Sequence, residues 1–116
     1  MNQSTEERVA AARARLAELR EKFIDRTQGE LAAMRESLAQ LQAGQAAGLG
    51  EIVRLAHRMA GTGATLGLDA LSDQARCIEK LAESSPSAAT DAGALRTLTA
   101  AVEQLAAELA RTRSSP

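Results

Sequence analysis

Residues 52–67 read IVRLAHRMAGTGATLG, and this stretch sets the frame for the rest of the chain. Its apolar residues recur at spacings of three, four and seven, which places them on one face of an α-helix: Ile52, Leu55, Met59 and Leu66. Gly67 follows at the position where a glycine commonly ends a helix. The stretch therefore predicts an amphipathic helix over about residues 49–66, with its apolar face packed against other helices.

The composition of the chain agrees with an all-α fold. Hydrophobic residues make up 45% of the 116 residues, and there is one Phe with no Tyr or Trp. Ala, Leu, Glu, Arg and Gln dominate, and these are good helix formers. Val and Ile are few and never alternate with polar residues over a run, as they would in a half-buried strand.

Two helices are predicted before the central one. Ser4 and Glu7 form an S-x-x-E capping box, which predicts a helix starting there and running to about Arg26. Thr27-Gln28-Gly29-Glu30 is a second such box, and we interpret it as a break and a restart. The next helix then extends to about Ala43. The apolar seam of the first helix is narrow and longer than a bundle needs: Val9, Ala12, Leu16, Leu19 and Phe23.

Two more helices are predicted after Gly67. One covers about residues 68–82, and a loop is predicted over residues 83–87. The last helix carries a seam over residues 95–109, and Pro86 is acceptable in the first turn of a helix that follows the loop. We expect an antiparallel up-down bundle of four amphipathic helices, preceded by a long N-terminal one. The chain is expected to be one domain over 1–116, with its core at about 22–110, an N-terminal extension at 5–21 and a frayed tail at 111–116.

Charge and composition exclude several function classes. The net charge of −1 argues against a general nucleic-acid binder. No apolar run approaches the ~20 residues that span a membrane, and the N-terminus lacks the apolar core of a signal peptide. A lone Cys77, expected to pack at the core boundary, fits a reduced cytoplasmic protein. One His and one Cys on different helices predict no metal site, and no phosphate-binding G-x-x-x-x-G-K-[ST] loop is present.

The only histidine, His57, is predicted on the outer face of the central helix. At about 100° per residue it lies roughly 200° from Leu55 and roughly 160° from Met59. Its expected neighbours on that face are Arg54, Gly61 and Ala64. An interior glycine costs about 1 kcal/mol relative to alanine, and a glycine at 61 would keep the imidazole open to a macromolecule. Two other interpretations remain: a solvated surface histidine, and glycines that allow close helix packing, since Gly63 falls toward the inner side.

His57 to Gly67, HRMAGTGATLG, resembles the motif of histidine-containing phosphotransfer (HPt) domains. Phe23-Ile24-Asp25-Arg26-Thr27 is similar to a segment before the second helix of that family, and LDALSDQARCIEKLAE is similar to its next helix. The resemblance covers about Lys22 to Ala110. It implies a four-helix bundle in a two-component phosphorelay, with His57 as phosphoacceptor, Gly61 as the small residue that keeps it open, and Gly67 as the turn.

The resemblance also implies partners and one departure. The phosphoryl group would be exchanged with the aspartate of a response-regulator receiver domain, which brings its own Mg²⁺, so no cofactor is expected in this chain. A hybrid histidine kinase is a further expected partner. The family usually has Lys where this chain has Ala60. Arg54 or Arg58 would then supply the positive charge, and Ala64 would lie on the docking face.

Three readings remain open. The first is a phosphoryl carrier, which is not an autonomous enzyme. The second, motivated by Ala60, is a degenerate HPt-like module that sequesters a receiver or another partner without chemistry. The third is the phosphoacceptor domain of a chemotaxis-type kinase. A monomer is expected, with a dimer through the N-terminal helix as the alternative.

Overall fold

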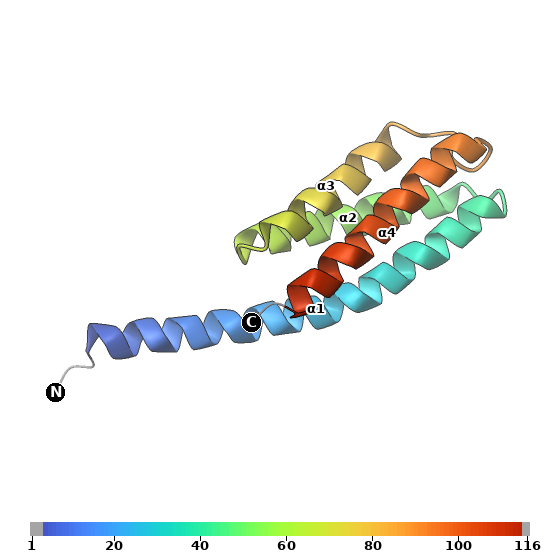
Figure 1. Ribbon diagram of the computed structural model, residues 1–116. Coiled ribbons are helices and arrows are strands. Elements are labelled where there is room, and N and C mark those ends of the chain that lie inside the picture. Colours follow the sequence, from blue (N-terminus) through green and yellow to red (C-terminus); the bar gives the residue numbers. More distant parts are fainter. Residues whose placement is uncertain (1–3, 115–116) are drawn as a thin grey trace.

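The computed structural model describes residues 4–114 and folds them into four α-helices. In chain order these are α1 (Thr5–Gln42), α2 (Ala47–Thr65), α3 (Asp69–Glu83) and α4 (Ala92–Ser114). Each helix packs on the next, and α4 returns to pack on α1, which closes an antiparallel up-down bundle (Figure 1). The all-α class and the bundle are as expected, and the residues that the structure describes contain no strand.

α1 is one continuous helix of 38 residues, so the predicted break at Thr27 is wrong. The N-terminal cap is as expected, with the Ser4 hydroxyl accepting a hydrogen bond from the Glu7 amide at 3.1 Å. At the second box, the Thr27 hydroxyl instead donates back to the Phe23 carbonyl at 2.8 Å. A threonine inside a helix can make this bond without opening the backbone. A capping motif therefore predicts a helix start only where free amides need a partner.

The helix ends follow from local chemistry. Gly44 and Gly67 adopt positive φ angles of +82° and +73°, directly after α1 and α2, where glycine is unstrained. α4 begins at Ala92, after the loop predicted over residues 83–87. Pro86 lies in the connection, and the Asp91 carboxylate accepts from the amides of Gly93 and Ala94 at 3.0 and 3.1 Å to start the helix.

The predicted tail and the predicted place of Cys77 also need correction. Residues 111–114 are helical, and Arg113 pairs with Asp25 of α1 at 3.1 Å. This surface contact links the last turn of α4 to α1. Residues 115–116 lie outside the described part of the chain. Cys77 is exposed rather than packed at the core boundary, because the buried face of α3 is already filled by Leu71, Ala75 and Ile78.

The core lies along the C-terminal half of α1, from Phe23 onward, and along the other three helices. Its fully buried apolar side chains include Met34, Leu41, Ile52, Met59, Leu71, Ile78, Leu98, Val102 and Leu105. Alanines at 56, 75 and 82 are also fully buried and allow the helix axes to approach closely. Leu66 and Leu68, at the α2–α3 turn, are only partly buried.

The first part of α1 projects beyond this bundle (Figure 1). None of residues 4–22 is buried, and burial begins at Phe23. The molecule is consequently long and thin, with principal extents of 66 × 22 × 18 Å.

Two glycines in the first turn of α2 should respond oppositely to alanine. A Cβ at Gly48 would lie 2.5 Å from the Ser37 backbone oxygen, whereas a Cβ at Gly50 would meet nothing within 4 Å. We expect Gly48→Ala to lower the free energy of unfolding by about 1–3 kcal/mol through overpacking. Gly50→Ala should raise it by about 0.5–1 kcal/mol through helix propensity. Urea denaturation of both variants beside the wild type measures this, and shifts of the same sign would contradict the close approach of α2 to α1.

Candidate functional site

His57 stands on the outer face of α2 with 77% of its side chain exposed. Gly61 is one turn further along the same face, and a Cβ built there meets nothing within 4 Å. Ala64, one turn beyond, is also exposed. The structure therefore brings together the small residues that the sequence placed beside the imidazole, and the ring is open to a large partner.

Glu79 of α3 contacts His57 from the neighbouring helix. The His57 Nδ1 and Glu79 Oε2 atoms are 2.7 Å apart, and the glutamate side chain is only 19% exposed. The positions of His57 and Glu79 relative to the Gly67 turn could have predicted this contact. His57 lies ten residues before Gly67 and Glu79 lies twelve after it, so a tight antiparallel hairpin brings the two to the same level.

This contact determines which imidazole nitrogen carries the proton. A carboxylate only accepts hydrogen bonds, so the Nδ1–H group donates to Glu79. In the neutral ring, Nε2 is then unprotonated and keeps its lone pair. A carboxylate that holds one ring nitrogen also orients the ring. The pair is suited to nucleophilic attack by Nε2 on an electrophile brought by a partner.

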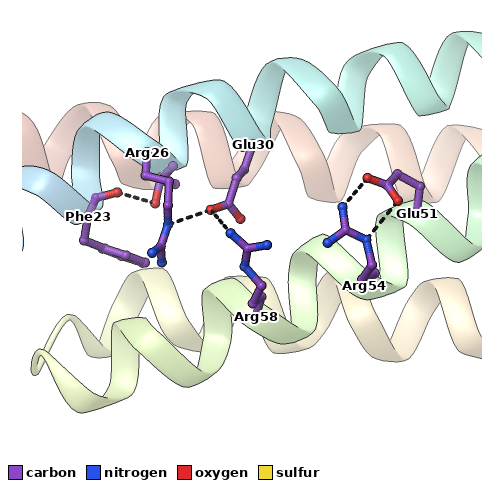
Figure 2. Close-up of polar contacts among 7 residues, drawn as sticks. Phe23, Arg26, Glu30, Glu51, Arg54 and Arg58 are labelled. Carbon is purple, nitrogen blue, oxygen red and sulfur yellow. Dashed lines mark hydrogen bonds and ion pairs between the residues drawn. The ribbon is translucent and has the colours of Figure 1, made fainter.

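Arg54 lies on the side of α2 nearer to α1 and is held by its own helix (Figure 2). Its Nε and Nη2 atoms donate to the two carboxylate oxygens of Glu51 at 3.0 and 2.6 Å. These hydrogen bonds, more than the charge attraction alone, lower the pKa of Glu51 and raise the pKa of Arg54. Two of the five N–H donors of Arg54 are therefore engaged by Glu51, which anchors the guanidinium on its own helix.

Arg58 is held more loosely. Its Nη2 atom lies 3.9 Å from Oε1 of Glu30, beyond hydrogen-bond distance (Figure 2). Its side chain is 53% exposed. Of the two arginines that the sequence proposed as sources of positive charge, Arg58 therefore has the weaker competing partner.

Glu30 was read from the sequence as a capping residue, and it is instead a nearly buried carboxylate between α1 and α2. Its side chain is 8% exposed, and Oε1 accepts from Arg26 Nε at 2.9 Å. Oε2 is buried without a hydrogen-bond partner among the described residues. Arg26 also lies over the Phe23 ring, 5.4 Å from its centroid. The Glu30 carboxylate thus attracts the side chains of both Arg26 and Arg58 to the boundary between α1 and α2.

Ala60 and Gly63 belong to the packed side of α2. Ala60 is 4% exposed, and its carbonyl accepts a hydrogen bond from the buried Ser72 hydroxyl at 2.7 Å. A Cβ on Gly63 would lie 3.4 Å from Ser72 Cβ and 3.6 Å from Phe23 Cζ. The two helical glycines therefore differ: Gly61 leaves the histidine face open, whereas Gly63 lets α3 and Phe23 pack close to α2.

Over residues 4–114, no group of three or more His, Cys, Asp or Glu side chains is placed to hold a metal ion. In the same range, none of the helices combines the length and apolarity that a membrane crossing requires.

Comparison with known proteins gives one match. Residues 18–112 match the family model of the Hpt domain, which is most of the chain. No curated protein and no solved structure matched the chain in the corresponding searches.

The tautomer of His57 should depend on Glu79. At pH 8, where an ordinary imidazole is neutral, ¹⁵N NMR of the wild-type ring should show a protonated Nδ1 and an unprotonated Nε2. Glu79→Ala should shift the equilibrium toward the Nε2–H form, because the acceptor for Nδ1–H is lost. Glu83→Ala, an exposed glutamate at the end of α3, is the matched control. Identical ring spectra for wild type and Glu79→Ala would refute the contact.

Proposed function

Because the chain belongs to the Hpt domain family, we propose that His57 accepts a phosphoryl group from the aspartate of a response-regulator receiver domain and returns it. The family implies a histidine phosphotransfer role in a phosphorelay, and its members are phosphoryl carriers rather than autonomous enzymes. The observation that supports His57 as the acceptor is its environment: an exposed sole histidine whose Nδ1 is engaged by Glu79.

The proposed step needs little from this chain. The Nε2 lone pair attacks the phosphorus of the aspartyl phosphate, an N–P bond forms, and the P–O bond to the aspartate breaks to release a carboxylate. Nδ1 keeps its proton, so the phosphorylated ring carries a positive charge that the nearby Glu79 carboxylate offsets. Phosphoryl transfer depends mainly on positioning and charge stabilisation. Glu79 would supply both as a positioning residue.

The remaining requirements would come from the partner. We expect the receiver domain to bring Mg²⁺, its aspartate and a lysine, so this chain needs no cofactor of its own. Gly61 and Ala64 present little side chain beside the imidazole, which would allow the partner's aspartate to reach Nε2. A larger side chain at 61 would lean back over the ring, because helical side chains point toward the N-terminus.

At the position of Ala60 the family usually has a lysine. We propose that Arg58, rather than Arg54, supplies the positive charge of that lysine. Arg54 is anchored by two short hydrogen bonds to Glu51, whereas Arg58 has only a 3.9 Å ion pair with Glu30 and is freer to move toward a partner. A guanidinium with free donors is well suited to a phosphoryl group. Ala60 itself is buried and would support the site through the packing of α2 on α3.

The acceptor role is tested by His57→Gln. We expect labelled phosphate to pass from a panel of acyl-phosphate-loaded receiver domains to the wild type, and not to the variant. The product should be acid-labile and base-stable, as expected for a phosphoramidate. Unchanged helicity by circular dichroism would show that the variant folds. Labelling of His57→Gln would remove His57 from the role, and binding of a receiver without transfer to wild type would favour the sequestering module.

The two arginines should differ in their effect on the phosphorylated state. Arg58→Ala should shorten the lifetime of the phosphohistidine by about two- to fivefold, which is the scale of an exposed charge interaction. Arg54→Ala should change it less, since that guanidinium is already bound to Glu51. The decay of isolated phosphoprotein, followed by gel mobility or ³¹P NMR, measures both. A larger effect from Arg54→Ala would reverse the assignment.

A further inference from the structure

Residues 5–22 of α1, which we call the N-terminal arm, form a helix that extends past the bundle (Figure 1). Eighteen helical residues span about 27 Å. None of them is buried, and Val9 and Leu19 are 43% and 37% exposed. A solvated helix has no need of leucine and valine at regular intervals, so the apolar residues of the arm require an explanation.

The apolar residues of the arm form one narrow stripe. They recur at alternating spacings of three and four up to the first buried residue of the bundle: Val9, Ala12, Leu16, Leu19 and Phe23. These are the a and d positions of a heptad repeat, the seam of a two-stranded coiled coil. The stripe lies on the same side of α1 as Phe23 and Met34, which the bundle covers. Beyond the α2–α3 turn the same face continues with no cover from residues 4–114.

Basic residues flank this stripe on both sides. The positions adjacent to the seam, e and g of the repeat, hold five cations and one acid: Arg8, Arg13, Arg15, Arg20 and Lys22, with Glu6. The other acids of the arm, Glu7, Glu18 and Glu21, lie toward the opposite face. Arg15 pairs with Glu18 at 3.2 Å, but both side chains are mostly exposed, so the pair is weak. The seam is therefore bordered by positive charge.

We propose that the N-terminal arm binds a partner helix whose own apolar stripe is flanked by acidic residues, forming a short two-stranded coiled coil. Charge at the flanking positions selects the partner of such a pair. A second copy of this chain is disfavoured. A parallel pair would set Arg8 against Arg13 and Arg15 against Arg20, and an antiparallel pair would set Arg13 and Arg15 each against its own copy.

The arm favours a single partner helix over a membrane surface. A helix that lies in a membrane interface has a wide apolar face, often with Trp or Phe inserted among the lipids. The stripe here is one residue wide per turn, includes Ala12, and has no aromatic residue before Phe23. A narrow seam of this kind buries well only against another narrow seam.

The arm is also prepared for binding. Isolated helices of this length are marginal in water, because helix nucleation is unfavourable. Here the helix continues from the packed part of α1, and Arg20 donates from Nε to the Leu66 carbonyl at 2.9 Å. The Ser4 cap closes the other end. A partner would not have to fold the arm, so the entropy cost of association is reduced.

The test uses the full chain and two synthetic 21-residue helical peptides with leucine at all a and d positions. One has glutamate at every e and g position, and the other has lysine there. Fluorescence anisotropy should show binding of the glutamate peptide that weakens with added salt, and no binding of the lysine peptide. Replacing Leu16 and Leu19 by Gln should weaken binding at least about tenfold. Ala14→Gln, on the outer face of the arm, is the matched control.

A charge-reversed variant, Arg8→Glu/Arg13→Glu/Arg15→Glu, should bind the lysine peptide more tightly than the glutamate peptide, the reverse of the wild type. The proposal is overturned if neither peptide binds, if the wild-type chain dimerises in sedimentation equilibrium, or if the arm binds anionic phosphatidylserine vesicles in preference to the glutamate peptide. Phosphate labelling of His57 in the same variants should be unchanged, because the arm is outside the site. Loss of peptide binding with intact labelling, or the reverse, separates this proposal from the phosphotransfer function.

Discussion

The turn at Gly67 is the constraint on which the arrangement around His57 depends. Its positive φ of +73° lets the Leu68 amide bond to the Gly63 carbonyl at 2.9 Å, so α3 starts within a few residues of the end of α2. The short connection sets the register of the two helices. One residue more or less in the turn would rotate α3 by about 100° relative to α2. Glu79 would then leave His57, and Ser72 would leave the Ala60 carbonyl.

Opposite charges are divided on the two sides of the histidine. On the side of α3, Glu79 holds Nδ1. On the side of α1, Arg54 and Arg58 face their own carboxylates. An imidazole between an anion and cations fits the proposed cycle, in which the ring becomes positive and the phosphoryl oxygens are negative. In the proposed cycle, the Glu30 carboxylate would compete with the phosphoryl group for Arg58.

α1 uses one apolar stripe in two settings. From Phe23 onward the stripe is buried by the other helices, and before Phe23 it is exposed along the N-terminal arm. The change occurs where the α2–α3 turn ends the bundle, and Arg20 binds the Leu66 carbonyl at that boundary. His57 lies on α2 and the arm belongs to α1, so the proposed phosphotransfer site and the arm use different surfaces. A phosphorylating partner and an arm-bound helix could then occupy the chain together.

The sequence by itself determined the helical class, the faces of α2 and the turn at Gly67. These follow from periodicity and from backbone preference, which act over a few neighbouring residues. It also placed His57 on an open surface, because two core residues on the same helix define the inner side. The resemblance to HPt domains rested on the same local motif and agrees with the family match.

Only the tertiary structure decided which residues act as partners. Thr27 and Glu30 match the sequence pattern of a capping box. In the structure, the Thr27 hydroxyl bonds within α1, and Glu30 lies buried beside Arg26 and Arg58. Glu79 resembled any solvated glutamate until α3 was placed beside α2. Side-chain pairing depends on register and burial between segments distant in the chain. Local backbone preferences can be inferred from neighbouring residues, but the distances between side chains of different helices are set only when the helices pack.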